Sequence, residues 1–229
     1  MKRKLISNIL KIIVIVSSFI GVILNAFSEY GRYIGSLKTF LYFTIQSNLW
    51  ISIWFLLLLI LWIIEKKKQK VIIKKWMYIV KYIFTVSITL TGMVYCFLLA
   101  PTAGEEFDTW SIHNILTHVV VPLFSIIDLF VDKYSLRIEN KNVFLVIIPP
   151  LYYFIISLIC YFNNVEFIEG QNYPYFFLNH SSPAKVFGFS NEPIYMGSFY
   201  WIVILLIFIL SMGFLYKFIY NKVNNKKAD

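Results

Sequence analysis

The sequence predicts an all-α integral membrane protein, a bundle of six transmembrane helices that forms one domain over residues 1–229. Three observations predict this fold class. Hydrophobic residues make up 59% of the chain and charged residues only 14%, whereas a soluble domain carries about a quarter charged residues. Six stretches of 17 to 26 residues lack Lys, Arg, Asp and Glu, and roughly 20 apolar residues cross a bilayer core. Basic residues gather between alternate stretches.

The six uncharged stretches set the expected helices. The first stretch is the shortest, and we expect the Lys11 side chain to extend it by reaching toward water. The start Met1-Lys2-Arg3-Lys4 is typical of a signal peptide, but no small-residue cleavage site follows, so we expect a retained helix. Pro149 and Pro150 are expected to kink the fifth helix near its start. The predicted helices cover about 8–28, 40–64, 79–101, 110–131, 142–163 and 196–219.

The basic residues predict the orientation. Eighteen of the 21 Lys and Arg residues lie before the first helix, between the second and third, after the fourth, or after the sixth. Because cytoplasmic loops carry the excess of Lys and Arg, both termini should be cytoplasmic, in a multi-pass protein of the cell membrane. The longest connection, 163–196, is then external. The charge of +9 marks topology in this interpretation, so we expect no nucleic-acid partner.

Polar residues inside the spans collect on two helices. An uncompensated polar group in hydrocarbon costs several kcal/mol, so these positions are informative. On the second helix, Thr44, Ser47 and Asn48 share one face because they are three and four residues apart. On the fourth helix a similar stripe holds Asn114, His118, Ser125 and Asp128. We expect the two faces to meet inside the bundle.

The two faces offer the parts of an acyl-transfer site. By the charge count both helices run inward, which places Thr44 about 5 Å and His118 about 12 Å below the outer surface. A histidine can take the proton of a threonine hydroxyl, so Thr44 is the candidate nucleophile and His118 the candidate base. Ser47 is the fallback nucleophile. Gln46, Ser47 or Asn48 is expected to donate hydrogen bonds to the oxyanion.

Other residues receive supporting roles. Asn114, one turn before His118, is expected to orient the imidazole. Asp128 lies about 15 Å further along the helix, so we expect it to pair with Lys133 or Arg137 near the cytoplasm. Further candidates for lining a substrate lie on the fourth helix and in the external loop: His113, Thr117, Tyr173, Pro174, Tyr175 and Phe177.

Three other interpretations stay open from spacing alone. Ser, Thr, Asn and His at helix interfaces often serve only to hold helices together. Asp128, His118 and Asn114 would line the path of a solute- or lipid-binding transporter, and a structural or assembly subunit needs no chemistry. His113 and His118 are five residues apart, about 140° around a helix, so one metal ion cannot readily reach both. We expect neither a metal nor a cofactor, and the oligomeric state is open.

The residues Phe43–Asn48 on the second helix resemble a motif of the bacterial Pr-six-Pr membrane proteins. His118 with Pro122 and Asp128, and Tyr173–Asn179 in the external loop, resemble the same family. The resemblance covers the second to the sixth helix. That family is distantly similar to the androgen-induced family of six-helix membrane proteins, which are threonine hydrolases. Those enzymes cleave fatty acid esters of hydroxy fatty acids with one threonine and one histidine.

Carried to this sequence, the resemblance implies Thr44 as nucleophile and His118 as base. These are the two residues that the polar faces also select. A membrane lipid or lipid ester is then the expected substrate. The external loop and the Ser47–Asn48 pair match the bacterial group and do not align with the androgen-induced enzymes. The resemblance therefore implies a reaction type and leaves the natural ester undefined.

Overall fold

The computed structural model describes residues 2–30, 33–34, 37–104, 108–132, 136–191 and 195–225. Within them lie six helices long and apolar enough to cross a membrane, which confirms the helical class. Three of the six are continuous and three contain a local change of helix type. The α-helical segments are α1 (Lys2–Ala26), α2 (Phe43–Lys68), α3 (Lys75–Val94), α4 (Ile112–Ile115), α5 (Val121–Val131), α6 (Asn140–Phe144), α7 (Ile148–Phe162) and α8 (Ser198–Asn225).

Several helices extend past the predicted limits. Lysine is a good helix former, so the charged flanks continue the helical backbone beyond the apolar segments. Helix α1 accordingly starts at Lys2, and α2 runs on to Lys68. Gln69 then ends α2 in the left-handed conformation, with φ of 49°. The hydropathy thus located each helix, whereas the helix ends lie in charged flanks that hydropathy assigns to the space outside the membrane.

The interrupted helices change type where the usual backbone hydrogen bonds cannot all form. Helix α3 continues through a π-helical turn, Tyr95–Leu99, and a 3-10 turn, Ala100–Thr102. A second π-helical turn, Leu116–Val120, joins α4 to α5. The irregularity expected at the two prolines takes the form of a 3-10 turn, Leu145–Ile147, between α6 and α7. The two π-helical turns matter most, because they shape the candidate site.

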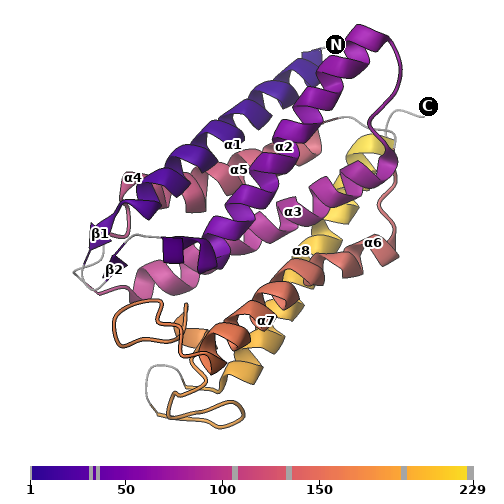
Figure 1. Cartoon of the computed structure of the whole chain (residues 1–229). Coiled ribbons are helices and arrows are strands. Elements are labelled where there is room, and N and C mark those ends of the chain that lie inside the picture. The colour runs from indigo at the N-terminus through magenta and orange to yellow at the C-terminus, as the bar shows by residue number, and fades with distance from the viewer. Residues whose placement is uncertain are drawn as a thin grey trace.

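Helix α3 lies at the centre of the bundle. It contacts α2 and α5 on one side and α7 and α8 on the other. Helices α1, α2 and α5 therefore form one group, and α6, α7 and α8 a second group that packs across α3 (Figure 1). The largest cluster of buried apolar side chains joins the two groups, with Tyr82 and Val86 of α3 fully buried in it.

The two ends of the bundle differ. The start of α1 and the end of α8 lie at the same end of the bundle, which we call the terminal end (Figure 1). The opposite end, the loop end, holds the segment 163–197 and a 3-10 turn, Leu37–Leu41, before α2. It also holds two two-residue strands, β1 (Glu29–Tyr30) and β2 (Tyr33–Ile34), which pair antiparallel. These strands are a minor departure from the all-α prediction.

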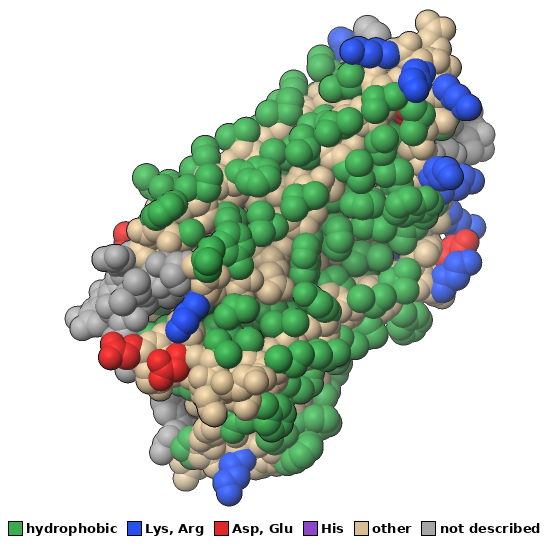
Figure 2. Space-filling view, in the orientation of Figure 1, with side chains coloured by type: hydrophobic (Ala, Val, Ile, Leu, Met, Phe, Trp, Pro, Cys, Tyr) green, Lys and Arg blue, Asp and Glu red, His purple; other side chains and the backbone are tan. Residues whose placement is uncertain are grey.

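The surface agrees with a multi-pass membrane protein. Large apolar side chains are exposed along the flanks, among them Ile12 at 51%, Ile155 at 56% and Ile207 at 60%. Figure 2 shows these hydrophobic flanks between the ends, with most of the visible Lys and Arg gathered at the terminal end. Such a flank is stable against lipid and unstable against water. The cytoplasmic location of the terminal end remains a prediction from the charge distribution.

Candidate active site

Thr44 is the second residue of α2 and is buried. A threonine inside a helix can donate its hydroxyl to the carbonyl one turn earlier, as Thr85 and Thr89 do here at 2.8 Å. The Thr44 hydroxyl instead lies 3.2 Å from Nε2 of His118. The structure therefore brings together the two residues that the polar faces selected, with the hydroxyl turned away from its own helix.

The second ring nitrogen of His118 determines which tautomer is present. Nδ1 lies 3.0 Å from the carbonyl oxygen of Asn114 and 3.1 Å from Oγ1 of Thr117. A carbonyl can only accept a hydrogen bond, and the Thr117 hydroxyl already donates to the His113 carbonyl. Both neighbours of Nδ1 thus accept, so Nδ1 carries the proton. Nε2 then presents its lone pair to Thr44, which is the arrangement of a general base.

The local backbone explains how His118 reaches this position. Pro122 has no N–H to donate to the His118 carbonyl, and the Val121 N–H donates to the Leu116 carbonyl across a wider turn. The result is the π-helical turn Leu116–Val120, a type of irregularity that is frequent at functional sites. In this turn the His118 side chain is directed between helices instead of toward lipid, and it is 6% exposed.

Neighbouring helices fix the imidazole in place. The Tyr95 ring stacks on it with 3.6 Å between centroids and 15° between planes. The Tyr95 hydroxyl donates to the Thr109 carbonyl. Two glycines allow the close approach of α1 and α3 to this turn. A Cβ on Gly21 would lie 2.7 Å from Cγ2 of Thr117, and one on Gly92 would lie 2.8 Å from the His118 carbonyl oxygen.

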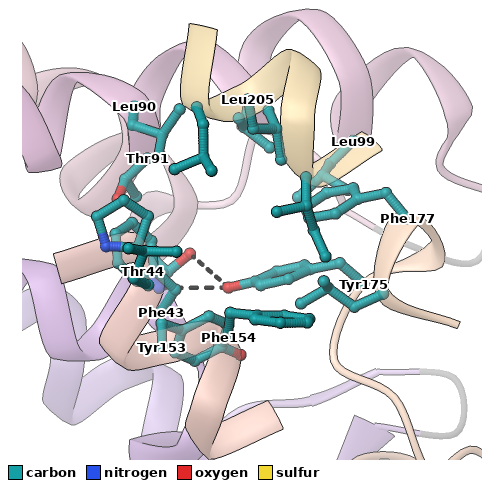
Figure 3. A pocket seen from close by; sticks show the side chains of 16 residues that line it. Phe43, Thr44, Leu90, Thr91, Leu99, Tyr153, Phe154, Tyr175, Phe177 and Leu205 are labelled. Atoms are coloured by element: carbon teal, nitrogen blue, oxygen red, sulfur yellow. Dashed lines mark hydrogen bonds between the residues drawn. The ribbon is translucent and has the colours of Figure 1, made fainter. Parts of the chain in front are cut away.

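An apolar cavity of about 70 Å³ opens beside Thr44. By the same measure one water needs ~10–15 Å³, so the cavity has room for several atoms of a chain. Figure 3 shows the Tyr175 hydroxyl directed at Thr44, while Leu90, Leu99 and Leu205 supply apolar walls. The remaining lining is also mostly apolar: Phe43, Thr91, Val94, Pro150, Leu151, Tyr153, Phe154, Phe177, Leu178, Ile202 and Leu206.

The cavity lies near the lipid-facing flank. Leu151 of α7 and Leu206 of α8 both line it, and Leu151 is 37% exposed. Only four lining residues carry a hydroxyl group: Thr44, Thr91, Tyr153 and Tyr175. The cavity therefore has one polar edge, at Thr44, and apolar walls. Such an arrangement suits a molecule with one polar functional group and a hydrocarbon tail.

The three expected oxyanion donors are engaged elsewhere. The Asn48 amide donates to the carbonyls of Thr44 at 2.8 Å and Thr117 at 3.1 Å. The Ser47 hydroxyl contacts Thr91 Oγ1 at 2.7 Å and the Thr44 carbonyl at 3.1 Å. The Gln46 amide donates to the Phe40 carbonyl. These contacts stabilise α2 and its packing, because each residue bonds a backbone or neighbouring helix atom.

The other candidates are only partly gathered at the cavity. Asn114 acts on His118 through its backbone carbonyl, because its side chain donates to the Asp108 carbonyl. Tyr175 and Phe177 line the cavity. Four candidates do not appear in its lining: His113, Thr117, Tyr173 and Pro174. Of these, Thr117 still contacts the imidazole of His118.

Asp128 does not pair with Arg137, one of its two expected partners. Asp128 pairs with Lys11 at 3.0 Å and with Lys81 at 2.6 Å, while Arg137 takes no part and Lys133 lies outside the described residues. Asp132 joins the same two lysines at 3.0 and 2.8 Å. Lys11 therefore does not reach toward water as expected. We call Lys4, Lys11, Lys81, Asp128 and Asp132 the charge cluster; it lies toward the terminal end.

A cluster of buried apolar side chains, which we call the apolar layer, lies between the charge cluster and the Thr44–His118 pair, together with the buried hydroxyls of Ser52, Thr85 and Ser125. On α1, α3 and α5, one layer residue lies between each charged position and the level of His118. The Phe55 ring forms the boundary, with its centroid 5.6 Å from the Lys11 ammonium and 5.7 Å from that of Lys81. The layer consists of five side chains with no exposed surface: Val14, Ile51, Phe55, Ile88 and Val121.

The fold and the site together define a class, a multi-pass membrane protein with a Thr–His hydrogen bond at the edge of an apolar cavity. Within the described residues, no group of three or more His, Cys, Asp or Glu side chains is arranged to hold a metal ion. Comparisons with protein-family models, curated proteins and solved structures find no match to this chain. The functional argument therefore depends on the site itself.

Proposed function

We propose that this protein is a membrane-embedded hydrolase of lipid esters, with Thr44 as nucleophile and His118 as general base. One observation carries the proposal: the Thr44 hydroxyl faces the lone pair of His118 Nε2 at 3.2 Å on the wall of an apolar cavity. A threonine hydroxyl is a weak nucleophile until a base removes its proton, and this contact is within hydrogen-bond reach.

The chemistry follows from this contact. Oγ1 of Thr44 attacks the ester carbonyl carbon while Nε2 of His118 accepts the hydroxyl proton. Collapse of the tetrahedral intermediate releases the alcohol, which takes the proton from Nε2, and leaves an acyl-threonine. A water molecule then attacks this ester, with His118 again accepting and returning a proton. Atoms and charges balance without a cofactor, and the products are a fatty acid and an alcohol.

The cavity indicates how the substrate lies. Its apolar walls accommodate the hydrocarbon part of the acyl group, because burying each CH₂ contributes about 0.8 kcal/mol. Thr44 lies at its polar edge, so the ester group is placed against the nucleophile. With the terminal end cytoplasmic, as the charge distribution predicts, the site lies in the outer half of the membrane. The lipid then enters sideways, between α7 and α8.

The apolar layer argues against a transport path. A path through Asp128, His118 and Asn114 would have to cross five fully buried apolar side chains. The polar side chains at the same level are uncharged hydroxyls, and two of them, Ser52 and Thr85, donate to backbone carbonyls. The resemblance to the threonine hydrolases points the same way, because it implies the same nucleophile and base.

The test is covalent labelling of the purified protein in detergent micelles by a fluorophosphonate probe. Thr44→Ala and His118→Ala are each expected to abolish labelling, and mass spectrometry should locate the adduct on Thr44. Thr85→Ala is the matched control, since Thr85 is buried in α3 and its hydroxyl bonds the Lys81 carbonyl. Ser47→Ala should also retain labelling.

Three outcomes would overturn the proposal. Labelling that survives both Thr44→Ala and His118→Ala would show that the pair is not catalytic. An adduct on Ser47 would move the nucleophile. A wild-type protein that binds lipid but neither reacts with the probe nor hydrolyses acyl esters would favour the non-enzymatic, lipid-binding alternative.

A further inference from the structure

A nucleophile and a base do not complete an acyl-transfer site. As Thr44 attacks, negative charge develops on the carbonyl oxygen, and a preorganised hydrogen-bond donor near that oxygen is often the largest catalytic contribution. Gln46, Ser47 and Asn48 already bond other atoms. The donor must therefore come from another part of the structure.

The side chain closest to filling this role is Tyr175, in the segment 163–197 at the loop end. Its hydroxyl oxygen lies 3.5 Å from Oγ1 of Thr44 and accepts a hydrogen bond from the Thr44 backbone N–H at 3.3 Å. The Thr44 hydroxyl proton is directed to His118. The Tyr175 hydroxyl also has the Tyr153 hydroxyl as a neighbour. Its proton can point toward Oγ1 of Thr44 or toward an oxygen bound next to it.

The phenol is held in one orientation before substrate arrives. Its ring stacks on Phe177 with 5.2 Å between centroids and 13° between planes. The Tyr42 ring packs on its edge at 6.0 Å. Burial raises the pKa of Tyr175, so its hydroxyl keeps its proton at neutral pH and remains a donor. A donor fixed in advance costs no reorganisation during the reaction.

The position of Thr44 at the start of a helix also favours negative charge beside Oγ1. Thr44 lies in the first turn of α2, where the N-cap residue Tyr42 provides no side-chain cap. The first amides of a helix carry partial positive charge, which stabilises an anion placed near them. An oxyanion formed on a carbonyl bound to Oγ1 lies between this helix start and the Tyr175 hydroxyl, where a donor distance of about 2.7–3.1 Å is effective.

We propose that the Tyr175 hydroxyl donates the hydrogen bond that stabilises the oxyanion, so that the segment 163–197 supplies a catalytic residue. This inference rests on the proposed function. When Oγ1 bonds to the carbonyl carbon, the π electrons move to the carbonyl oxygen, which accepts the Tyr175 O–H. The proton stays on Tyr175 throughout. On collapse the carbonyl re-forms, the alcohol leaves with the proton from His118, and Thr44 remains acylated until water releases the fatty acid.

The test compares Tyr175→Phe with Tyr42→Phe in hydrolysis of p-nitrophenyl octanoate by the full-length protein in detergent. Tyr175→Phe keeps the ring that packs on Phe177 and removes only the hydroxyl. We expect kcat to fall about 100-fold with KM unchanged, and the fluorophosphonate adduct to form on Thr44 more slowly. Tyr42→Phe is the matched control, because its hydroxyl bonds the Phe167 carbonyl instead of Thr44. It should keep the wild-type kcat.

The outcomes separate this inference from the proposed function. A wild-type kcat in Tyr175→Phe, with Thr44→Ala inactive, would overturn the role of Tyr175 and leave the Thr–His pair intact. Equal losses in Tyr175→Phe and Tyr42→Phe, with a raised KM, would show that the tyrosines only anchor the loop. An active Thr44→Ala protein would overturn both proposals. Elution of each variant as a single peak in size-exclusion chromatography checks that it is folded.

Discussion

Replacing Gly21 with alanine should displace His118, the proposed base, without touching it. The new Cβ would lie 2.7 Å from Cγ2 of Thr117 and 3.2 Å from Cβ of Leu116. Carbon atoms in contact prefer about 3.5–4.0 Å, so the π-helical turn must move by roughly 1 Å. Rotating Thr117 would not relieve the contact cheaply, because its hydroxyl bonds the His113 carbonyl and contacts His118 Nδ1.

The consequences for Gly21→Ala follow from this displacement. Overpacking of this kind costs about 1–3 kcal/mol of stability. A misplacement of about 1 Å near the reacting atoms can lower a rate about 100-fold. We therefore expect a lower midpoint of thermal unfolding in detergent and a much larger proportional loss in the rate of fluorophosphonate labelling.

The matched control is Gly104→Ala, since a Cβ on Gly104 would have no neighbour within 4 Å. It should label at the wild-type rate. Gly92→Ala presses on the same turn from α3 and should reproduce the loss. A Gly21→Ala protein that labels as fast as wild type would refute the reasoning. The position of His118 would then not depend on the close approach of α1.

Three other substitutions test separate parts of the structure. Asp128→Asn leaves buried lysines short of countercharge and should lower the free energy of unfolding by about 3–5 kcal/mol. The unfolding temperature should fall, whereas labelling per folded molecule should be unchanged. An equally stable variant would contradict this. Tyr95→Leu removes the ring stacked on His118 and should slow labelling up to about tenfold. Tyr95→Phe keeps the ring and should label at the wild-type rate. Equal labelling rates for the two variants would show that the stacking is unimportant. Leu205→Trp reduces the volume of the cavity and should lower the ratio of kcat/KM for p-nitrophenyl octanoate to kcat/KM for p-nitrophenyl butyrate at least about tenfold. The reason is that burying the four additional CH₂ groups of the octanoate contributes about 3 kcal/mol. An unchanged ratio would place the acyl chain elsewhere.

The sequence was sufficient for the parts of the structure that depend on the membrane environment. Uncharged stretches locate the six helices because the bilayer core excludes charge. Polar residues inside these stretches are costly unless they meet partners. This is why the spacing of Thr44 and His118 on their helices was enough to predict that their side chains meet.

Other parts of the site could not be predicted from the sequence. Tyr95 resembles any aromatic residue near a membrane boundary, and its stacking depends on a π-helical turn that periodicity does not show. Gly21 and Gly92 matter only because two helices approach the same turn. Ser47 and Asn48 share a face with Thr44, but a shared face does not show which atoms their donors reach, and both residues bond other atoms.

The partners of Asp128 illustrate another limit. Lys11 and Lys81 appeared to be topology signals at the edges of helices. An acidic residue inside a span nevertheless requires a countercharge at similar depth, and Lys11 and Lys81 lie on helices packed against that of Asp128. Matching charges by depth along neighbouring helices, instead of by nearness in sequence, would have favoured them over Arg137.

The apolar layer has a consequence for the cell as well as for the site. An energised membrane must not leak protons, yet this bundle holds an imidazole in one half and lysines and aspartates in the other. The apolar layer occupies the level between them. The buried polar side chains at that level are uncharged hydroxyls, among them Ser52, Thr85 and Ser125. Moving a charge past this level is costly because no countercharge lies among the layer side chains, which limits leakage of protons through the bundle.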